Sequence, residues 1–283
     1  MQPEHVEVNG RRTRVLVDGD PQAPPIVLLH GIGRSLEDWE PQFSRYVQAG
    51  YRVIAPDLPG CGFSDRLPTP TTLPTIAQSV VETLDVIGET GQLHVMGHSL
   101  GGAVALQLLA LEPRRVATLV LANSGGFGSE VHPMLRLVAA PVIGSVVSSY
   151  TTRFSARMTE RLLYVDQSLA TKERIDHALK LARQPDTGAV RHETARSLGT
   201  IRGIRPEWRR QLMADASKHL RPMLIIWGDR DRILPAKQLE AARRFLPLAR
   251  VHLFKEVGHS PQIEVAGRFA ELTLDFLRSP AIA

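Results

Sequence analysis

The chain has 283 residues, of which 43% are hydrophobic and 22% are charged, and this composition excludes a disordered or fibrous protein. Its formal net charge is +5 at pH 7, but the basic residues form only scattered pairs, such as Arg11–Arg12 and Arg209–Arg210. The charge therefore indicates a solvated surface rather than a nucleic-acid partner.

The single cysteine, Cys61, excludes an internal disulfide and is consistent with a reducing compartment. The first residues contain no apolar stretch of the kind found in secretory signals. The longest apolar stretch, residues 135–147, is interrupted by Arg136 and Pro141 and is shorter than the ~20 residues that span a bilayer. We therefore expect a cytoplasmic protein with no transmembrane segment, whose oligomeric state the sequence does not reveal.

Short apolar runs alternate with helical patterns along the chain. A hairpin is expected first, where Val6–Val8 and Arg14–Val17 flank the turn residues Asn9–Gly10. The later runs are solidly apolar, which is typical of parallel strands buried on both faces. They are Pro25–Leu29, Tyr51–Ala55, Leu93–Met96, Thr118–Ala122, Met223–Trp227 and Val251–Phe254.

Helical patterns connect or follow these runs. The expected helices are Ser35–Ala49, Leu73–Gly88, Gly101–Leu111, Pro235–Leu246 and Ile263–Leu277. Pro235 would suit the first turn of its helix, because proline lacks only a hydrogen-bond donor that the first turn does not use. Strands that alternate with helices predict an α/β fold with a mostly parallel, doubly wound sheet.

One long segment interrupts this alternation. From about residue 125 to 219 the patterns are helical, as in Met134–Leu137, Ser155–Tyr164, Lys172–Arg183 and Arg191–Leu198. We interpret the segment as a helical cap inserted after the sixth strand, over the carboxyl edge of the sheet. Residues 1–124 and 220–283 then form the core, and 125–219 the cap. Ordinary crossover helices are the alternative.

The residues Gly97-His98-Ser99-Leu100-Gly101 match the G-x-S-x-G pattern of a serine nucleophile. An apolar strand precedes the motif and a helical pattern follows it, as this chemistry requires. The serine must stand exposed on a sharp strand-to-helix turn, and small neighbours relieve the crowding there. The motif predicts Ser99 as a nucleophile; a glycine turn that merely carries a serine is the alternative.

The residues His30-Gly31-Ile32-Gly33 follow the strand at 25–29. An acyl-transfer enzyme needs N–H donors that point at the developing oxyanion. One donor is expected from Leu100, the residue after the nucleophile, and the other from the loop after the earlier strand. We assign the second donor to Ile32.

A triad also needs a carboxylate and a histidine after the serine in chain order. Asp229 and Asp231 both follow the strand at 223–227, and the preceding strand ends at Asn123-Ser124, which offers no carboxylate. His259 follows the last strand, where the fold can bring an imidazole to the serine. Its Nε2 would accept the serine proton while its Nδ1–H bonds the aspartate.

The remaining histidines are interpreted as structural or surface residues. His98 is expected to diverge from Ser99 and to serve packing or the pocket rather than proton transfer. The others are His5, His94, His132, His177, His192, His219 and His252. No pair has metal-ligand spacing with acidic or cysteine partners, and there is no glycine-rich phosphate or dinucleotide loop, so no metal and no cofactor are expected.

Five strings together resemble successive landmarks of the α/β-hydrolase superfamily. They are HGIGRSLEDWE, APDLPGCGFSD, VMGHSLGG, IIWGDRDRILP and VGHSPQIE, and they span nearly the whole chain except the cap. The resemblance implies that Asp231 rather than Asp229 is the acid, and that Asp57 and Gly60 shape a turn near the pocket. It also implies the α/β-hydrolase fold with a helical cap.

The resemblance narrows the activity without fixing it. Haloalkane dehalogenases and epoxide hydrolases carry an aspartate where this chain has Ser99. Carbon–carbon hydrolases of aromatic ring-fission products remain an alternative, since QAGYRVIAPDLPG and LVLANSGGFG resemble theirs. They usually have asparagine in place of Gln107 and a tryptophan soon after the catalytic histidine, where this chain has Ser260-Pro261-Gln262.

We therefore expect a serine hydrolase of the esterase and lipase kind, with Ser99, His259 and Asp231 as triad and Ile32 and Leu100 as oxyanion donors. Its partner would be a small ester with a largely apolar acyl group of small to medium size. Carbon–carbon cleavage, with Arg191 or Arg196 holding a substrate carboxylate, acyl transfer to an acceptor other than water, and a non-catalytic binding protein are the alternatives.

Overall fold

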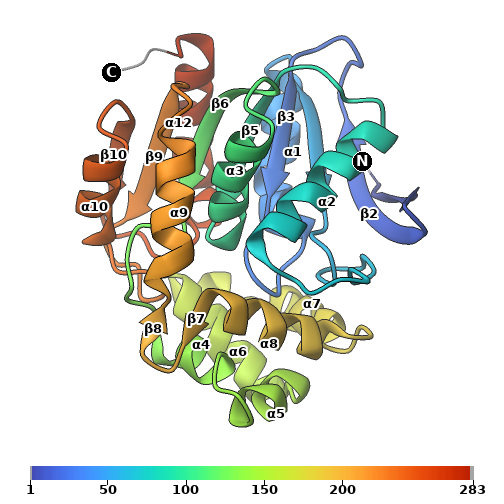
Figure 1. Cartoon of the computed structure of the whole chain (residues 1–283), viewed down its shortest axis with the longest axis vertical. Helices are drawn as coiled ribbons and strands as arrows, with labels where there is room; N and C mark the ends of the chain where they lie inside the picture. Colours follow the sequence, from blue (N-terminus) through green and yellow to red (C-terminus); the bar gives the residue numbers. More distant parts are fainter. Residues whose placement is uncertain (1, 281–283) are drawn as a thin grey trace.

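The computed structural model describes residues 2–280 and is built around an eight-stranded sheet (Figure 1). Its strands are β1 (Glu4–Val8), β2 (Arg11–Asp18), β3 (Pro25–Leu29), β4 (Arg52–Pro56), β5 (Leu93–His98), β6 (Val116–Ala122), β9 (Met223–Gly228) and β10 (Arg250–Phe254). Their order across the sheet is β1-β2-β4-β3-β5-β6-β9-β10. The pairs β1–β2 and β2–β4 are antiparallel, and the other neighbours are parallel. The expected α/β-hydrolase fold is confirmed.

Local chemistry accounts for the first hairpin. Asn9 and Gly10 both have positive φ, 50° and 74°, as a two-residue hairpin turn requires, and they join β1 to β2 at the predicted turn. Farther along, the central strands are solidly apolar because helices cover both of their faces. Val95, Leu119 and Ile225 face one buried cluster, whereas Met96, Val120 and Ile226 face the other.

The helices of this layered unit are η1 (Leu36–Trp39), α1 (Glu40–Gln48), α2 (Leu73–Val86), α3 (Leu100–Leu111), α10 (Gln238–Phe245), α11 (Pro261–Glu264) and α12 (Ala266–Arg278). The helices α2, α3 and α10 pack on one face of the sheet, and α1 and α12 pack on the other. The sequence placed the start of α10 too early. Pro235 lies in the turn before the helix, where its carbonyl accepts a hydrogen bond from the Gln238 N–H at 2.9 Å. The last expected helix is divided at Val265, which has non-helical φ and ψ.

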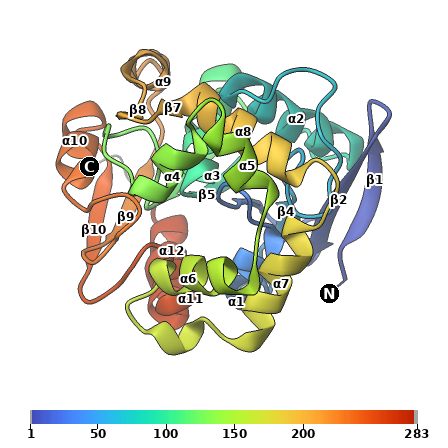
Figure 2. The same cartoon turned by 90° about the horizontal axis from the view of Figure 1, so that it is seen from below.

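Between β6 and β9 the chain is almost entirely helical, as expected after the sixth strand. This segment contains α4 (Pro133–Val138), α5 (Ile143–Ser149), α6 (Arg153–Leu163), η2 (Gln167–Leu169), α7 (Lys172–Ala182), α8 (Thr187–Leu198), the short strands β7 (Gly199–Thr200) and β8 (Gly203–Ile204), and α9 (Pro206–Ala216). Figures 1 and 2 show α4 to α8 gathered beyond one edge of the sheet.

The helix α9 leaves that group and runs beside α3 (Figure 1). Its residues Leu212, Met213 and Ala216 belong to the buried cluster on that face of the sheet. The sequence patterns missed α5, α9 and the β7–β8 pair. The division at residues 125 and 219 stays a prediction. Within residues 2–280, no helix is long and apolar enough to cross a membrane.

Candidate active site

Ser99 occupies the turn between β5 and α3. Its φ is 56° and its ψ is −115°, a strained conformation for a residue with a side chain. The flanking glycines make this turn possible. A Cβ on Gly97 would lie 2.2 Å from the Gly101 carbonyl oxygen, and a Cβ on Gly101 would lie 2.1 Å from that of Leu29. The G-x-S-x-G spacing thus lets helix, strand and turn approach one another while the serine is held at the strand end.

The imidazole of His259 is fixed by a carboxylate. Its Nδ1 lies 2.8 Å from Oδ2 of Asp231, and both side chains are buried. Asp231 Oδ1 accepts hydrogen bonds from the N–H groups of Ile233 at 2.7 Å and Leu234 at 2.9 Å. Because all partners of this carboxylate are donors, Nδ1 of His259 carries the hydrogen and Nε2 is left to accept one.

Asp229, the other candidate acid, lies apart from the imidazole. Its Oδ1 accepts a hydrogen bond from the Glu256 N–H at 2.8 Å, and its Oδ2 lies 3.7 Å from Nζ of Lys255. These contacts stabilise the loop after β10. The structure therefore brings Asp231, and not Asp229, against His259.

Asn123 is a member of the site that the sequence reasoning passed over. It follows β6 with φ of 45°, is fully buried, and donates from Nδ2 to Asp231 Oδ2 at 2.7 Å and to the Gly258 carbonyl at 3.3 Å. The same Asp231 oxygen accepts the hydrogen of His259. Asparagine tolerates left-handed backbone better than most residues, so an Asn at the end of this strand was the available signal.

His98 supports the main chain of His259 instead of competing with it. Its Nε2 donates to the His259 carbonyl oxygen at 2.8 Å, and the two ring centroids lie 4.8 Å apart. Burial, with a smaller contribution from His259, lowers the pKa of His98 to about 3. His98 is therefore neutral near pH 7, and its ring lines the cavity that also contains Ser99.

The two expected oxyanion donors lie at the serine. Leu100 begins α3, so its N–H has no acceptor within the helix. Ile32 lies in the loop after β3, where a Cβ on Gly31 would lie 3.4 Å from Cβ of Ser99. In the described chain neither N–H takes part in a hydrogen bond. His30 fixes the loop, because its ring nitrogens contact the Gly31 carbonyl at 2.8 Å and the Leu58 N–H at 2.9 Å.

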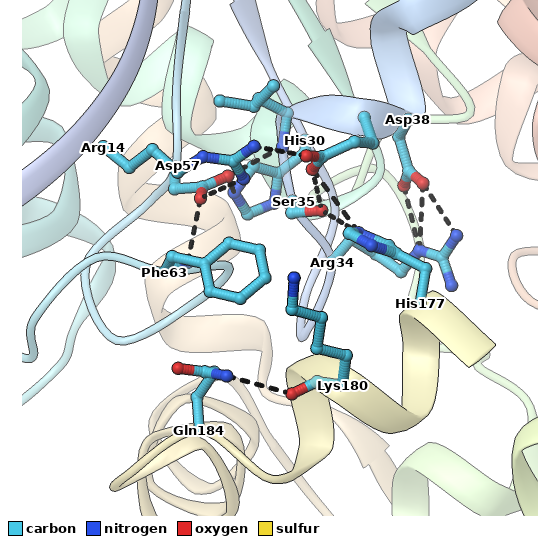
Figure 3. Close-up of polar contacts among 12 residues, drawn as sticks. Arg14, His30, Arg34, Ser35, Asp38, Asp57, Phe63, His177, Lys180 and Gln184 are labelled. Atoms are coloured by element: carbon cyan, nitrogen blue, oxygen red, sulfur yellow. Dashed lines mark hydrogen bonds and ion pairs between the residues drawn. The ribbon is translucent and has the colours of Figure 1, made fainter. Parts of the chain in front are cut away.

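Asp57 ties together the loops beside the site (Figure 3). Its carboxylate accepts hydrogen bonds from the N–H groups of Leu36 at 2.8 Å and Phe63 at 2.9 Å, and from the Arg14 guanidinium at 3.2 Å. A Cβ on Gly60, whose φ is +66°, would lie 2.6 Å from the Val190 side chain on α8. Asp57 and Gly60 thus shape the turn after β4, as the resemblance implies.

Glu37 joins the same loops to α7. Its carboxylate lies 2.6 Å from the Ser35 hydroxyl, 2.5 Å from the Arg14 guanidinium and 3.4 Å from Nε2 of His177. Burial would raise the pKa of Glu37, but hydrogen bonds from His177, Arg14 and Ser35 outweigh it. The pKa of Glu37 therefore lies well below its ordinary value.

Two arginines border the site, and they differ in what they contact. Arg34 bonds Asp38 at 2.7 Å and 3.0 Å and also contacts the fully buried Glu160 of α6. Burial alone would raise the pKa of Asp38, but Arg34 outweighs it and the pKa lies below its ordinary value. Arg191 on α8 donates to the Ser148 carbonyl, while its buried Nε has no partner among the described residues. Arg34 is thus neutralised by carboxylates, and Arg191 is not.

Two cavities meet at Ser99. The larger, of about 200 Å³, is lined by Ser99 and His259, passes Arg34 and Arg191, and extends to the exposed Tyr150. The smaller, of about 70 Å³, is mostly apolar and contains the side chains of Leu198 and Trp208. Both include Ile32, Ser99 and Leu135. Within residues 2–280, no group of three or more His, Cys, Asp or Glu side chains is arranged to hold a metal ion.

Residues 24–266 match the family model described as the alpha/beta hydrolase fold. The chain is 31% identical, over 98% of its own length and 69% of the relative's, to the dihydrolipoyllysine-residue acetyltransferase component of an acetoin cleaving system from Pseudomonas putida. It is 28% identical to a 2-hydroxy-6-oxo-6-phenylhexa-2,4-dienoate hydrolase from Burkholderia cepacia, over 93% and 91% of the two chains. The structure of a meta-cleavage product hydrolase from Pseudomonas fluorescens superposes with a TM-score of 0.80 at 24% identity, covering 98% of each chain.

Proposed function

Because the chain belongs to the alpha/beta hydrolase fold family, we propose that it is a serine hydrolase that cleaves carboxylic esters. We assign Ser99 as nucleophile, His259 as general base and Asp231 as the acid that orients the imidazole. One observation carries the proposal. A serine on a strained strand-to-helix turn shares a cavity with a histidine whose Nδ1 is 2.8 Å from a buried carboxylate.

The geometry supports the following sequence of steps. Ser99 Oγ attacks the ester carbonyl, and His259 Nε2 takes its proton. The N–H groups of Ile32 and Leu100 stabilise the oxyanion, and the imidazolium then protonates the leaving alcohol. Water, activated by the same imidazole, attacks the acyl-enzyme and releases the acid. No hydrogen bond joins Ser99 to His259 in the described chain, and such bonds often tighten only when substrate is bound.

The form of the two cavities supports an acyl group of small to medium size that is largely apolar. Leu135, Ala139 and Leu198 line the smaller cavity, and they come from the helices between β6 and β9. We propose that residues 125–219 act as a cap, because their side chains close both cavities over the carboxyl ends of the strands. The substrate would then be selected mainly by the cap, and the chemistry by the sheet.

Carbon–carbon cleavage is a second candidate, and Arg191 favours it. A dienoate substrate carries a carboxylate, and Arg191 lines the larger cavity with its buried Nε unpaired in the described part of the chain. The Burkholderia relative is named as a hydrolase of such a compound. Arg34 is a poor partner for this substrate, because Asp38 and Glu160 already neutralise it. Gln107, where those enzymes usually have asparagine, weakens this alternative.

The test is hydrolysis of 4-nitrophenyl esters of increasing acyl length, with the Ser99→Ala variant in parallel. We expect turnover by the wild-type protein, a preference for apolar acyl chains, and a loss of several orders of magnitude in the variant. Faster cleavage of a dienoate ring-fission product than of any ester would favour the second candidate. Binding of esters without turnover of either substrate class would contradict catalysis and leave a binding protein.

A further inference from the structure

A concentrated apolar surface lies at the tip of the helical segment, away from the sheet. Six of the thirteen large apolar side chains that are exposed in the described residues fall between residues 142 and 158. They form what we call the tip surface: Val142, Ile143, Val146, Tyr150, Phe154 and Met158, which are between 52% and 77% exposed. Single exposed apolar residues are common, whereas six on the neighbouring segments of one end of the molecule favour an interaction site.

The tip surface adjoins the opening of the larger cavity. It is formed by α5, α6 and the residues that join them, at the end of the molecule opposite the strands (Figures 1 and 2). Tyr150, Thr151 and Ser155 belong to this region and also line the cavity that holds Ser99 and His259. A molecule that binds the tip surface therefore lies at the way into the site.

Basic side chains border the tip surface, together with the acidic Asp176. No charged residue occurs from 137 to 152, and the first charges on either side are Arg136 and Arg153. A shallow depression of about 500 Å³ beside Phe154 is lined by Arg153, Arg157 and Lys172. Asp176 pairs with Arg153 and Lys172, but Arg157 has no acidic partner among the described residues. An apolar centre with an arginine border complements an anionic, lipid-like surface.

We infer that the tip surface docks on a membrane of anionic phospholipids, which delivers lipid-dissolved esters to the cavity. The apolar side chains would enter the boundary between headgroups and acyl chains, and the arginines would contact phosphates. A twofold pairing of two copies through the same surface is disfavoured, because it would bring the arginine borders together. The inference rests on the proposed ester hydrolysis for the source of the substrate, but the docking itself does not.

The experiment measures sedimentation of the full chain with vesicles and needs no turnover. One set of vesicles is phosphatidylcholine, and the other is an equimolar mixture with phosphatidylglycerol. The test variant carries Ile143→Ser, Val146→Ser and Phe154→Ser, none of which lines the cavity of Ser99. Its matched control carries Val86→Ser, Leu220→Ser and Phe245→Ser, which remove exposed apolar side chains elsewhere.

We expect binding to the anionic vesicles, weaker binding to phosphatidylcholine, and loss of binding as salt is raised. The tip variant should bind at least about tenfold more weakly, while the control binds like wild type. Arg157→Gln should weaken binding about fivefold, whereas Arg243→Gln, an exposed arginine on α10, should have no more effect than a general loss of charge.

Absence of vesicle binding, or equal binding by the tip variant and its control, would overturn the inference. A wild-type dimer that the tip variant converts to a monomer would also overturn it and identify the surface as a contact between copies. Activity on dissolved short esters separates this inference from the proposed function. Vesicle binding without hydrolysis of any ester would support the docking surface and contradict the proposed esterase activity. Hydrolysis of dissolved esters without vesicle binding would support the esterase activity and contradict the docking surface.

Discussion

Replacing Asp231 by asparagine should disable the site through hydrogen-bond direction rather than through shape. The N–H groups of Ile233 and Leu234 both donate to Oδ1, so the amide oxygen of the introduced asparagine must take that position. The new NH₂ group then stands where Oδ2 accepted hydrogens from Asn123 Nδ2 at 2.7 Å and His259 Nδ1 at 2.8 Å. Donors would face donors, and the imidazole would have to change tautomer or turn away.

The size of the effect follows from this change of tautomer. With hydrogen on Nε2, His259 cannot accept the proton of Ser99. The same replacement in a serine protease of another fold lowers kcat about 10⁴-fold, which corresponds to about 5 kcal/mol in the barrier. We expect a loss of that order here. Asp229→Asn is the matched control, because Asp229 contacts the Glu256 N–H and Lys255 instead of the imidazole. Its activity should stay within about twofold of wild type.

The assay is kcat/KM on the best ester of the chain-length series, with urea unfolding to show that both variants remain folded. A loss of kcat/KM smaller than tenfold in Asp231→Asn would refute the reasoning, since the reversed hydrogen bonds would then have little effect on catalysis. An equal loss in Asp229→Asn would refute it as well. That outcome would mean that the loop after β9 matters as a whole and not through one carboxylate.

Three further predictions concern other parts of the molecule. Asn123→Leu removes the hydrogen bond from Nδ2 to the buried Oδ2 of Asp231 and should lower kcat/KM about tenfold, because this oxygen then keeps His259 as its only donor; an unchanged kcat/KM would contradict this. Gly101→Ala should lower the free energy of unfolding in urea by at least about 2 kcal/mol, because the new Cβ would lie 2.1 Å from a β3 carbonyl oxygen. Gly267 has open space around it, so Gly267→Ala should raise the same free energy by about 0.5 kcal/mol. Glu37→Gln should lower the free energy of unfolding by about 1 kcal/mol at pH 7. Because folding lowers the pKa of Glu37, the stabilisation by its carboxylate is present above the ordinary pKa of 4.5 and is lost as the pH falls. The difference from wild type in urea unfolding should therefore shrink between about pH 5 and pH 2. A constant difference across that range would show that Glu37 acts through packing alone.

The sheet and the Ser99 turn were predictable because their signals are local. Glycines at positions 97 and 101 are needed only where a strand, a turn and a helix crowd together, and asparagine and glycine are the residue types that most readily adopt the positive φ of Asn9 and Gly10. Solidly apolar runs likewise indicate strands that are buried on both faces of the sheet. Each of these features can be found in a stretch of fewer than ten residues.

The environment of Asp231 was not predictable in the same way. Its partners come from the end of β6, from the loop after β9 and from beyond β10, so Asn123 lies 108 positions away in the chain. The helix α5 was missed for another reason. Its Ile143 and Val146 are exposed while Gly144 and Ser148 are buried, so the apolar period expected of a helix on a protein surface is absent.

The chain enters and leaves the group of helices α4 to α8 at neighbouring points. The N–H of Ile204 donates to the Ser129 carbonyl at 2.9 Å, so the chain leaves the helices α4 to α8 at almost the point where it joined them. An insertion that starts and finishes at one place can be lengthened, shortened or exchanged with little effect on the strands that flank it. Evolution, or a protein engineer, could thus graft a different set of helices between these two positions and leave the Ser99 turn untouched. Under the proposed role of these helices, specificity would be a replaceable module of such a protein.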